Sequence, residues 1–165
     1  PRDESSTWPI ARVRHGEATA FATWAGASLP TEAQWERAAK GGHDEFVFPW
    51  GVTDIVSRRN GRAGLRLPPK ARVRSYPPID FGVYDVAGSV AEWCADWYQA
   101  DLYAAGPASD PSGPASGTLR VVRGGSRGDT TSTQIRTSAR SGVEPDDASG
   151  FRGFRCARTI PDTAR

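Results

Sequence analysis

The sequence predicts an α+β fold with short helices and a small, mostly antiparallel sheet. Glycine and proline make up about a fifth of the 165 residues, with 18 Gly and 13 Pro, which favours many turns over long helices. Two segments have helical spacing of apolar residues, and the later apolar segments are short and rich in β-branched or aromatic residues. A chain of this length is typical of one domain, and we assign residues 1–165 to a single one.

The helical segments are residues 17–25 and 31–40. In the first, Ala18 and Ala22 lie on one helical face with other small or aromatic residues, and a glycine follows the last turn. In the second, Thr31 and Gln34 have the spacing of a capping box, in which each side chain satisfies a backbone N–H group at the helix start. Both helices are therefore predicted to be short and to begin and end at definite residues.

Three later segments are predicted to build the sheet. Residues 80–98 are dense in aromatic residues and turns, and residues 119–122 are β-branched and end at a glycine pair. Residues 153–158 form a final strand with Phe154 and Cys156 on one face. We expect four tryptophans in the core: Trp35, Trp50, Trp93 and Trp97.

Charge and hydropathy exclude some partner classes. The formal charge of +2 is too small to indicate a nucleic-acid partner, and no apolar run approaches the roughly 20 residues that span a bilayer. Nearly all the basic residues are arginine, which is typical of a high-GC, bacterial genome and alternatively of anion recognition. The basic stretch at residues 58–74 is interpreted as a long surface loop, with an acidic partner or nucleic acid as the alternative.

Cysteine and histidine are too sparse for an ordinary metal site. The chain has two cysteines, Cys94 and Cys156, without CxxC spacing, and two histidines, His15 and His43. A three-histidine or two-histidine-one-carboxylate site is not easily built from this set. We interpret the cysteines as small buried hydrophobic residues, with a disulfide between them as the alternative.

Five short motifs follow one another along residues 8–158. They are LPTEAQWE at 29–36, FPWG at 48–51, FGVYDVAG at 81–88 leading into Glu92 and Trp93, RVVRGGS at 120–126, and GFRCA at 153–157. Together they resemble the formylglycine-generating-enzyme, or sulfatase-modifying-factor, family. The resemblance implies a C-type-lectin-like fold and covers only the later part of the family domain. We therefore expect the N-terminal part to be absent from this chain, and an upstream domain or neighbouring subunit to complete the fold.

The resemblance also implies where copper would bind. The family's oxidases hold copper with two cysteines between the GGS turn and an Ala-Arg-Ser segment, which is residues 139–141 here. The interval at residues 127–138 contains no sulfur, and Ser132 stands at one of the two cysteine positions. A hydroxyl group does not replace a thiolate as a copper(I) ligand. We therefore expect no copper and lean against an enzyme.

Calcium is a further expectation from the resemblance. Asn60 matches a calcium-linked asparagine of the family, and Ser89 stands where the family carries another, close to Glu92. Calcium prefers six to eight oxygen ligands. Calcium at Asn60, Ser89 and Glu92 stays open as a possible cofactor site.

A polar segment near the C-terminus is the candidate ligand surface. Residues 126–142 are small and polar, and the family fold implies that they lie on an exposed face supported by a rigid core. A surface loop without function is the alternative. The predicted ligand-binding residues are Arg127, Asp129, Thr131, Ser132, Thr133, Arg136 and Arg140, with a protein or peptide as the ligand.

Three functions are consistent with these observations. The first is a non-catalytic binding module, with a variable protein of a diversity-generating retroelement as its most specific form; those relatives vary the stretch that corresponds to residues 126–154. The second is an oxidoreductase of the formylglycine-generating type or of the iron-dependent sulfoxide-synthase type, whose iron histidines lie in a separate helical domain. The third is an accessory subunit of a larger assembly. The sequence does not predict a compartment.

Overall fold

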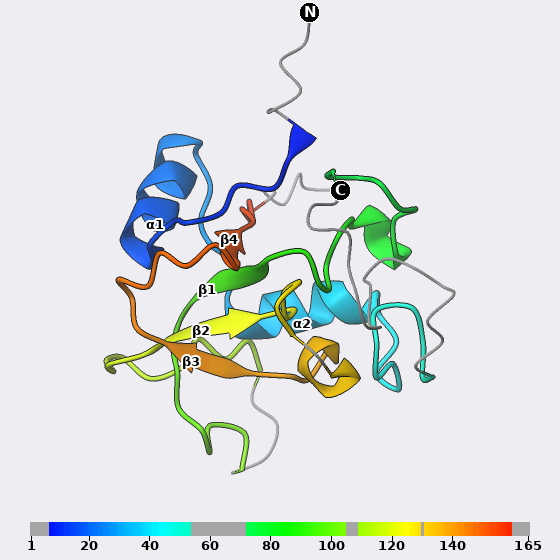
Figure 1. Ribbon diagram of the computed structural model, residues 1–165. Helices are drawn as coiled ribbons and strands as arrows, with labels where there is room; N and C mark the ends of the chain where they lie inside the picture. The colour runs from blue at the N-terminus through cyan, green and yellow to red at the C-terminus, as the bar shows by residue number, and fades with distance from the viewer. Residues whose placement is uncertain (1–6, 54–71, 105–108, 130, 160–165) are drawn as a thin grey trace, which may run out of the picture.

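Short helices and strands separated by long connections make up the fold (Figure 1). The computed structural model describes residues 7–53, 72–104, 109–129 and 131–159. Its elements are the helices α1 (His15–Trp24) and α2 (Glu32–Lys40), the 3-10 turns η2 (Asp80–Gly82) and η3 (Ser132–Ile135), and the strands β1 (Ala91–Trp97), β2 (Arg120–Arg123), β3 (Ser141–Val143) and β4 (Arg152–Phe154).

The two helices begin and end where local chemistry dictates. At α2, Thr31 Oγ1 accepts a hydrogen bond from Gln34 N at 3.2 Å, and Gln34 Oε1 accepts one from Thr31 N at 2.9 Å, which confirms the predicted capping box. Helix α1 starts two residues earlier than predicted. The Glu17 carboxylate accepts a hydrogen bond from Arg14 N at 2.8 Å, and so satisfies a donor that precedes the first turn.

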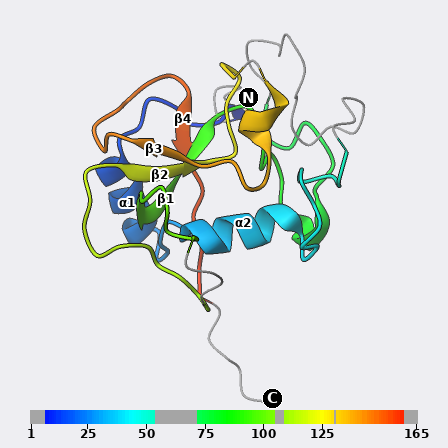
Figure 2. The ribbon, with the colours of Figure 1, turned by 90° about the horizontal axis from the view of Figure 1, so that it is seen from below.

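The four strands form one mixed sheet in the order β3-β2-β1-β4 (Figure 2). Strand β2 pairs antiparallel with both β1 and β3, and β4 pairs parallel with β1. The central strand therefore aligns Trp93 with Val122 on one side and with Phe154 on the other. The prediction of a small, mostly antiparallel sheet is confirmed.

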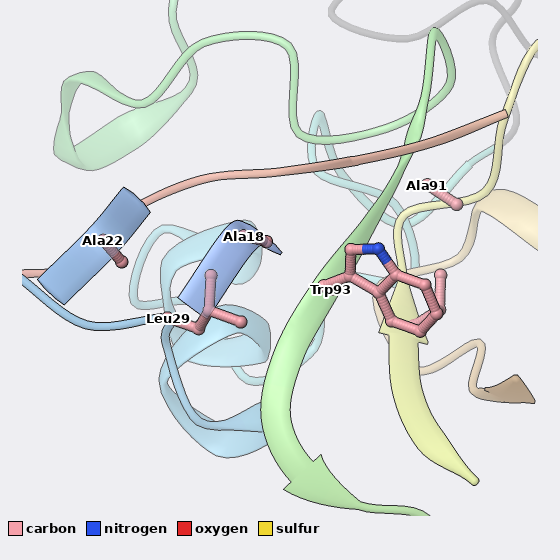
Figure 3. Close-up of a cluster of buried hydrophobic side chains, with 6 residues drawn as sticks. Ala18, Ala22, Leu29, Ala91 and Trp93 are labelled. Carbon is pink, nitrogen blue, oxygen red and sulfur yellow. The ribbon is translucent and has the colours of Figure 1, made fainter. Parts of the chain in front are cut away.

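Alternate residues of the central strands fill two separate cores. Trp93 and Val122 pack with Ala18 and Ala22 of α1 (Figure 3). The next residue of β1, Cys94, belongs to a second cluster with α2. Because successive side chains of a strand point to opposite faces, the two helices cover opposite faces of the sheet. The sequence of β1 is consequently buried on both sides over its first four residues.

The tryptophan predictions are right except at Trp97. Trp35 and Trp93 are 1% and 0% exposed, as expected. Trp50 is half-buried and packs against the buried cluster of Phe48, Ala87 and Ile135. Trp97 is half-buried and belongs to no core cluster of the described residues, so its assignment to the core is wrong. Trp97 lies near the end of β1, where the guanidinium of Arg120 lies 3.4 Å from its ring centre in place of apolar neighbours.

The disulfide that was the alternative for the two cysteines is not formed. Both thiols are free; Cys94 is buried and Cys156 is exposed. The register of β1 and β4 explains the separation, because Phe154 lies opposite Trp93 and Cys94 faces the other core. The final strand is shorter than predicted, and beyond Phe154 only Ala157 returns to a β-bridge, with Ser28. Burial as a small hydrophobic residue therefore describes Cys94 and does not describe Cys156.

Candidate functional site

One buried arginine ties the candidate ligand segment to the rest of the fold. Arg123 ends β2 and is 1% exposed. Its Nη1 atom lies 3.3 Å from Glu32 Oε1, and its Nη2 atom pairs with Glu36, so that it bonds twice to α2. The same guanidinium donates hydrogen bonds to Thr137 O at 2.6 Å and to Ala139 O at 2.9 Å. The chain after the GGS turn is therefore held against α2 from inside.

A second arginine shares the same buried carboxylate. Arg140 places Nε 2.6 Å and Nη2 2.8 Å from the two oxygens of Glu32, which is completely buried. The hydrogen bond to Glu32 raises the pKa of Arg140, and burial beside that carboxylate raises the pKa of Tyr103 to about 12. Arg140 was expected to contact a ligand, but its guanidinium is committed to this interior pair. We leave it out of the candidate surface.

A further glutamate–arginine pair lies at the start of β1, where Glu92 is in register with Arg123 of β2. Glu92 accepts hydrogen bonds from Trp35 Nε1 at 2.7 Å and from both Nε and Nη2 of Arg155. Both carboxylate oxygens of Glu92 are thus engaged, which counts against this residue as a calcium ligand. Ser89 contributes its carbonyl oxygen to Arg127 N at 3.1 Å, and Asn60 lies outside the described residues. In the part of the chain that the structure describes, no three His, Cys, Asp or Glu residues cluster as metal ligands.

The segment that follows β2 is anchored at both ends. Gly124 has a φ of 86°, and a Cβ atom there would lie 2.6 Å from Val86 O, so the turn requires glycine. At the other end, Ile135 and Thr137 are buried, and Thr137 Oγ1 donates to Phe46 O at 2.8 Å. In Figure 1 this segment is the yellow and orange coil beyond the end of β2.

Hydrogen bonds inside the segment fix its shape. Asp129 accepts hydrogen bonds from Ser126 N and, at 2.7 Å, from Gln134 Nε2. Gln134 Oε1 in turn accepts from Thr131 Oγ1 at 2.9 Å. Gln134 was missed as a site residue, although Thr131 and Gln134 repeat the capping spacing that was recognised at Thr31. The described polar groups of the turn therefore bond to one another.

Most of the predicted ligand residues gather on one outer surface. Thr131, Thr133 and Arg136 are exposed, and Arg127, Asp129 and Ser132 are half-buried. Exposed Gln134 lies among them. We call this set the η3 surface: Arg127, Asp129, Thr131, Ser132, Thr133, Gln134 and Arg136.

The residues of this surface do not fit copper. Its donors are hydroxyl, amide, carboxylate and guanidinium groups, whereas copper(I) requires soft sulfur ligands. Cys94 is completely buried, and burial raises its pKa well above the usual range, which keeps the thiol protonated. Cys156 lies beyond β4, outside the η3 surface. The thiolate pair of a copper oxidase is therefore not assembled here.

Comparison with known proteins agrees with this fold. Residues 1–160 match the model of the "Sulfatase-modifying factor enzyme 1-like domain". The chain belongs to this family. A formylglycine-generating enzyme of Thermomonospora curvata is 40% identical over 167 residues, covering 90% of this chain and 55% of its own length. The inactive C-alpha-formylglycine-generating enzyme 2 of Bos taurus is 37% identical over 169 residues, covering 93% and 51%.

A solved structure supports the same assignment. Treponema denticola variable protein 1 superimposes with a TM-score of 0.74 and 25% identity, covering 93% of this chain and 72% of that protein. The sulfatase-modifying factor fold expected from the five motifs is thus confirmed. The chain spans about half the length of the curated relatives it matches.

Two remaining expectations concern regions away from the η3 surface. Most of the basic stretch at residues 58–74 falls outside the described ranges; within them, the Arg74 guanidinium lies 5.1 Å from the Tyr84 ring centre. As for a membrane, none of the described helices is both long and apolar enough to cross one.

Proposed function

We propose that this chain is a non-catalytic binding module that recognises a protein or peptide through the η3 surface. The observation that carries the proposal is the contrast within one short segment. Arg123 and Thr137 fix its backbone from the interior, while Thr133 and Arg136 present their side chains to solvent. The family scaffold thus displays polar side chains from a preformed turn.

A preformed turn favours binding for an entropic reason. Association immobilises side chains and loops, and each rotamer-rich side chain that becomes ordered costs roughly 0.5–1.5 kcal/mol. A backbone that is already held by buried hydrogen bonds does not incur its share of this cost again. The small hydroxyl and amide side chains of the η3 surface also provide adaptable hydrogen bonding, which suits recognition of a polar protein surface.

The donor chemistry supports a binding role over an oxidase. The η3 surface carries no thiolate. The buried carboxylates of Glu32 and Glu92 form ion pairs with arginine side chains. Among the relatives, one carries the name of an inactive enzyme and another is called a variable protein. These names support, as the more specific form of the proposal, a variable protein of a diversity-generating retroelement.

Selection from a random-peptide display library tests the binding role. The wild-type chain is the bait, and the selected peptides are titrated against two variants. We expect Thr133→Ala/Arg136→Ala to weaken binding by about tenfold or more, because polar contacts at the η3 surface are lost. The control Arg58→Ala/Arg62→Ala removes positive charge from the basic stretch and should change the affinity less than about threefold. Loss of binding in the control alone would move the site to the basic stretch.

A copper titration tests the oxidase alternative directly. We expect no stoichiometric copper(I) binding and no conversion of a peptide cysteine to formylglycine, because the η3 surface lacks sulfur. The measurement is a competition titration with a copper(I) chelator, repeated with Cys156→Ser. One-to-one binding in the wild type that disappears in this variant would show that the site lies at Cys156 and would contradict the proposal.

A further inference from the structure

Two arginines from distant parts of the chain converge on one turn beside the η3 surface. Arg127 Nη2 donates a hydrogen bond to Gly150 O at 2.8 Å, and its guanidinium lies 5.0 Å from the ring centre of Phe151. A Cβ atom placed on Gly150 would lie 3.5 Å from Arg127 Nη2 and 3.8 Å from Arg12 Nε. Both guanidinium groups therefore approach the same peptide unit.

Arg12 has no partner of its own in the part of the chain that the structure describes. It lies in the segment that leads into α1 and is exposed, and its guanidinium makes no hydrogen bond or ion pair within residues 7–53, 72–104, 109–129 and 131–159. Nearby Arg14 is different, because it pairs with Glu17 at 3.4 Å. The backbone of Arg12 has a φ of 62°, a conformation that is unfavourable for residues other than glycine and that clusters at ligand sites.

The acidic residue nearest to Gly150 in the sequence, Asp147, already has bonding partners. Asp147 lies 3.4 Å from Arg152 Nη2 and accepts a hydrogen bond from Ser149 N at 2.7 Å. No carboxylate in the described ranges lies within ion-pair distance of Arg12 or Arg127. Two neighbouring positive charges without a counter-ion repel each other, and an anion placed between them removes that repulsion.

We propose that Arg12 and Arg127 form a carboxylate-binding site for an acidic peptide held at the η3 surface. The inference rests on the proposed binding function and names the chemistry of the partner. Guanidinium forks match the planar geometry of a carboxylate and bind it with paired, charge-assisted hydrogen bonds. Phe151 is 41% exposed beside the site and provides an apolar wall for the rest of the acidic residue. Arg127, one of the predicted ligand residues, thereby acquires a specific role.

A titration followed by NMR tests the site without any selected peptide. The Nε–Hε resonances of Arg12 and Arg127 are monitored in the labelled chain. The probes are N-acetyl-aspartate amide, N-acetyl-glycine, the uncharged N-acetyl-asparagine amide, and inorganic phosphate. We expect saturable shifts with the first two probes and none with the asparagine analogue. The tighter of the two carboxylates shows whether an acidic side chain or a chain terminus is the natural source.

Matched arginine variants decide the outcome. Because Arg12 is exposed and pairs with no described residue, Arg12→Ala should leave the fold intact and weaken carboxylate binding by about tenfold. Arg37→Ala removes an exposed arginine of α2 that lies outside the η3 surface and pairs with Asp44, and it should change binding by less than about twofold. Equal losses in both variants would show unspecific charge attraction and overturn the site. Tighter binding of phosphate than of either carboxylate would overturn the assignment to an acidic peptide.

The two proposals can fail separately. If the probes bind at Arg12 but the display library yields no peptide, the carboxylate site stands and the peptide-binding function fails. If peptides bind through Thr133 and Arg136 but ignore Arg12→Ala, the binding function stands and this inference fails.

Discussion

The interior around Arg123 and the η3 surface are joined by one segment of the chain, but their arginines differ in how they are bonded. Arg123 and Arg140 are each held by a buried carboxylate and by backbone carbonyl groups. On the η3 surface, by contrast, the guanidinium of Arg136 has no hydrogen bond or ion pair to any described residue. The residues that mark the family are thus largely those that hold the fold, and the residues free to make new contacts lie between the motifs.

This contrast explains why family membership does not by itself define function here. Glu32, Glu92, Arg123 and Arg155 all belong to the five motifs, and all four are paired in the interior. Buried ion pairs add little net stability compared with apolar packing, but removing one partner leaves an uncompensated charge. The motif residues therefore constrain one another, whereas the exposed side chains of Thr133 and Arg136 make no hydrogen bond or ion pair with them.

The largest effect is expected at the core tryptophan. Trp93→Ala should lower the free energy of unfolding by about 3–5 kcal/mol, because it removes a completely buried ring and leaves a cavity beside α1. The matched control is Trp24→Ala, since Trp24 is 81% exposed. Thermal and chemical unfolding give the comparison. Equal destabilisation in the two variants would contradict the assignment of Trp93 to the core and of Trp24 to the surface.

A comparable loss is expected from the central arginine. Arg123→Ala removes a partner of buried Glu32 and of two backbone carbonyl groups, and should cost about 3–5 kcal/mol of unfolding free energy. Arg136→Ala, on the exposed side of the same segment, should stay within about 0.5 kcal/mol of the wild type. Urea denaturation of both variants measures the difference, which should vanish if the two arginines occupy equivalent environments.

A smaller effect is expected at the glycine turn. Gly124→Ala forces a side chain into a positive φ and against Val86 O and the Trp35 ring, which should cost about 2–3 kcal/mol. Gly16→Ala provides the control, because a Cβ atom there meets nothing within 4 Å and the residue lies in α1. This control should be stabilising by roughly 0.5–1 kcal/mol. The melting temperatures should therefore shift in opposite directions.

The smallest effect concerns pH. Asp96 accepts a hydrogen bond from Glu32 N at 2.7 Å, its Oδ1 has no hydrogen-bond partner in the described part of the chain, and burial raises its pKa. A raised pKa in the folded state means that this carboxyl contributes stability below its unfolded pKa, near 4, and that the contribution is lost as the pH rises through the folded pKa.

Asp96→Asn isolates that contribution. The variant should match the wild type near pH 3.5 and become more stable than it by pH 6.5, because the amide does not ionise. Unfolding by urea at both pH values measures the gain, with exposed Asp110→Asn as the control. A relative stability that falls between these pH values would contradict the assigned direction.

Local patterns predicted the elements well and the interior chemistry poorly. The capping box at Thr31 and the glycine turn after β2 could be predicted from the sequence, because each depends on residues within a few positions of one another. The pairing of Glu32 with Arg140 joins residues far apart in the sequence, so no spacing could indicate it. The sequence alone therefore predicts a ligand residue at Arg140 and does not indicate its buried partner Glu32.

The candidate surface was predicted in part for the same reason. A polar, glycine-bounded segment predicts that residues 126–142 lie on an exposed face. Thr133 and Arg136 are exposed there, whereas Ile135 and Thr137 are buried. The approach of Arg12 to Gly150 had no counterpart in the sequence, because it depends on how the chain before α1 crosses the turn after β3. At Trp97 the sequence predicted burial that the structure does not show. An aromatic residue near a strand end can be covered by a guanidinium group instead of by apolar core residues.

The two cysteines give the protein a built-in chemical label. A thiol-reactive dye should attach at Cys156 alone in the native state. Cys94 is buried where β1 packs against α2, and its raised pKa keeps the thiol protonated. Unfolding releases the second thiol, so the number of reactive groups per chain changes from one to two. The same attachment point borders a hollow lined by Ile10, Phe21 and Phe154. A fluorophore placed there would report, without any substitution, on whatever comes to rest against that apolar wall.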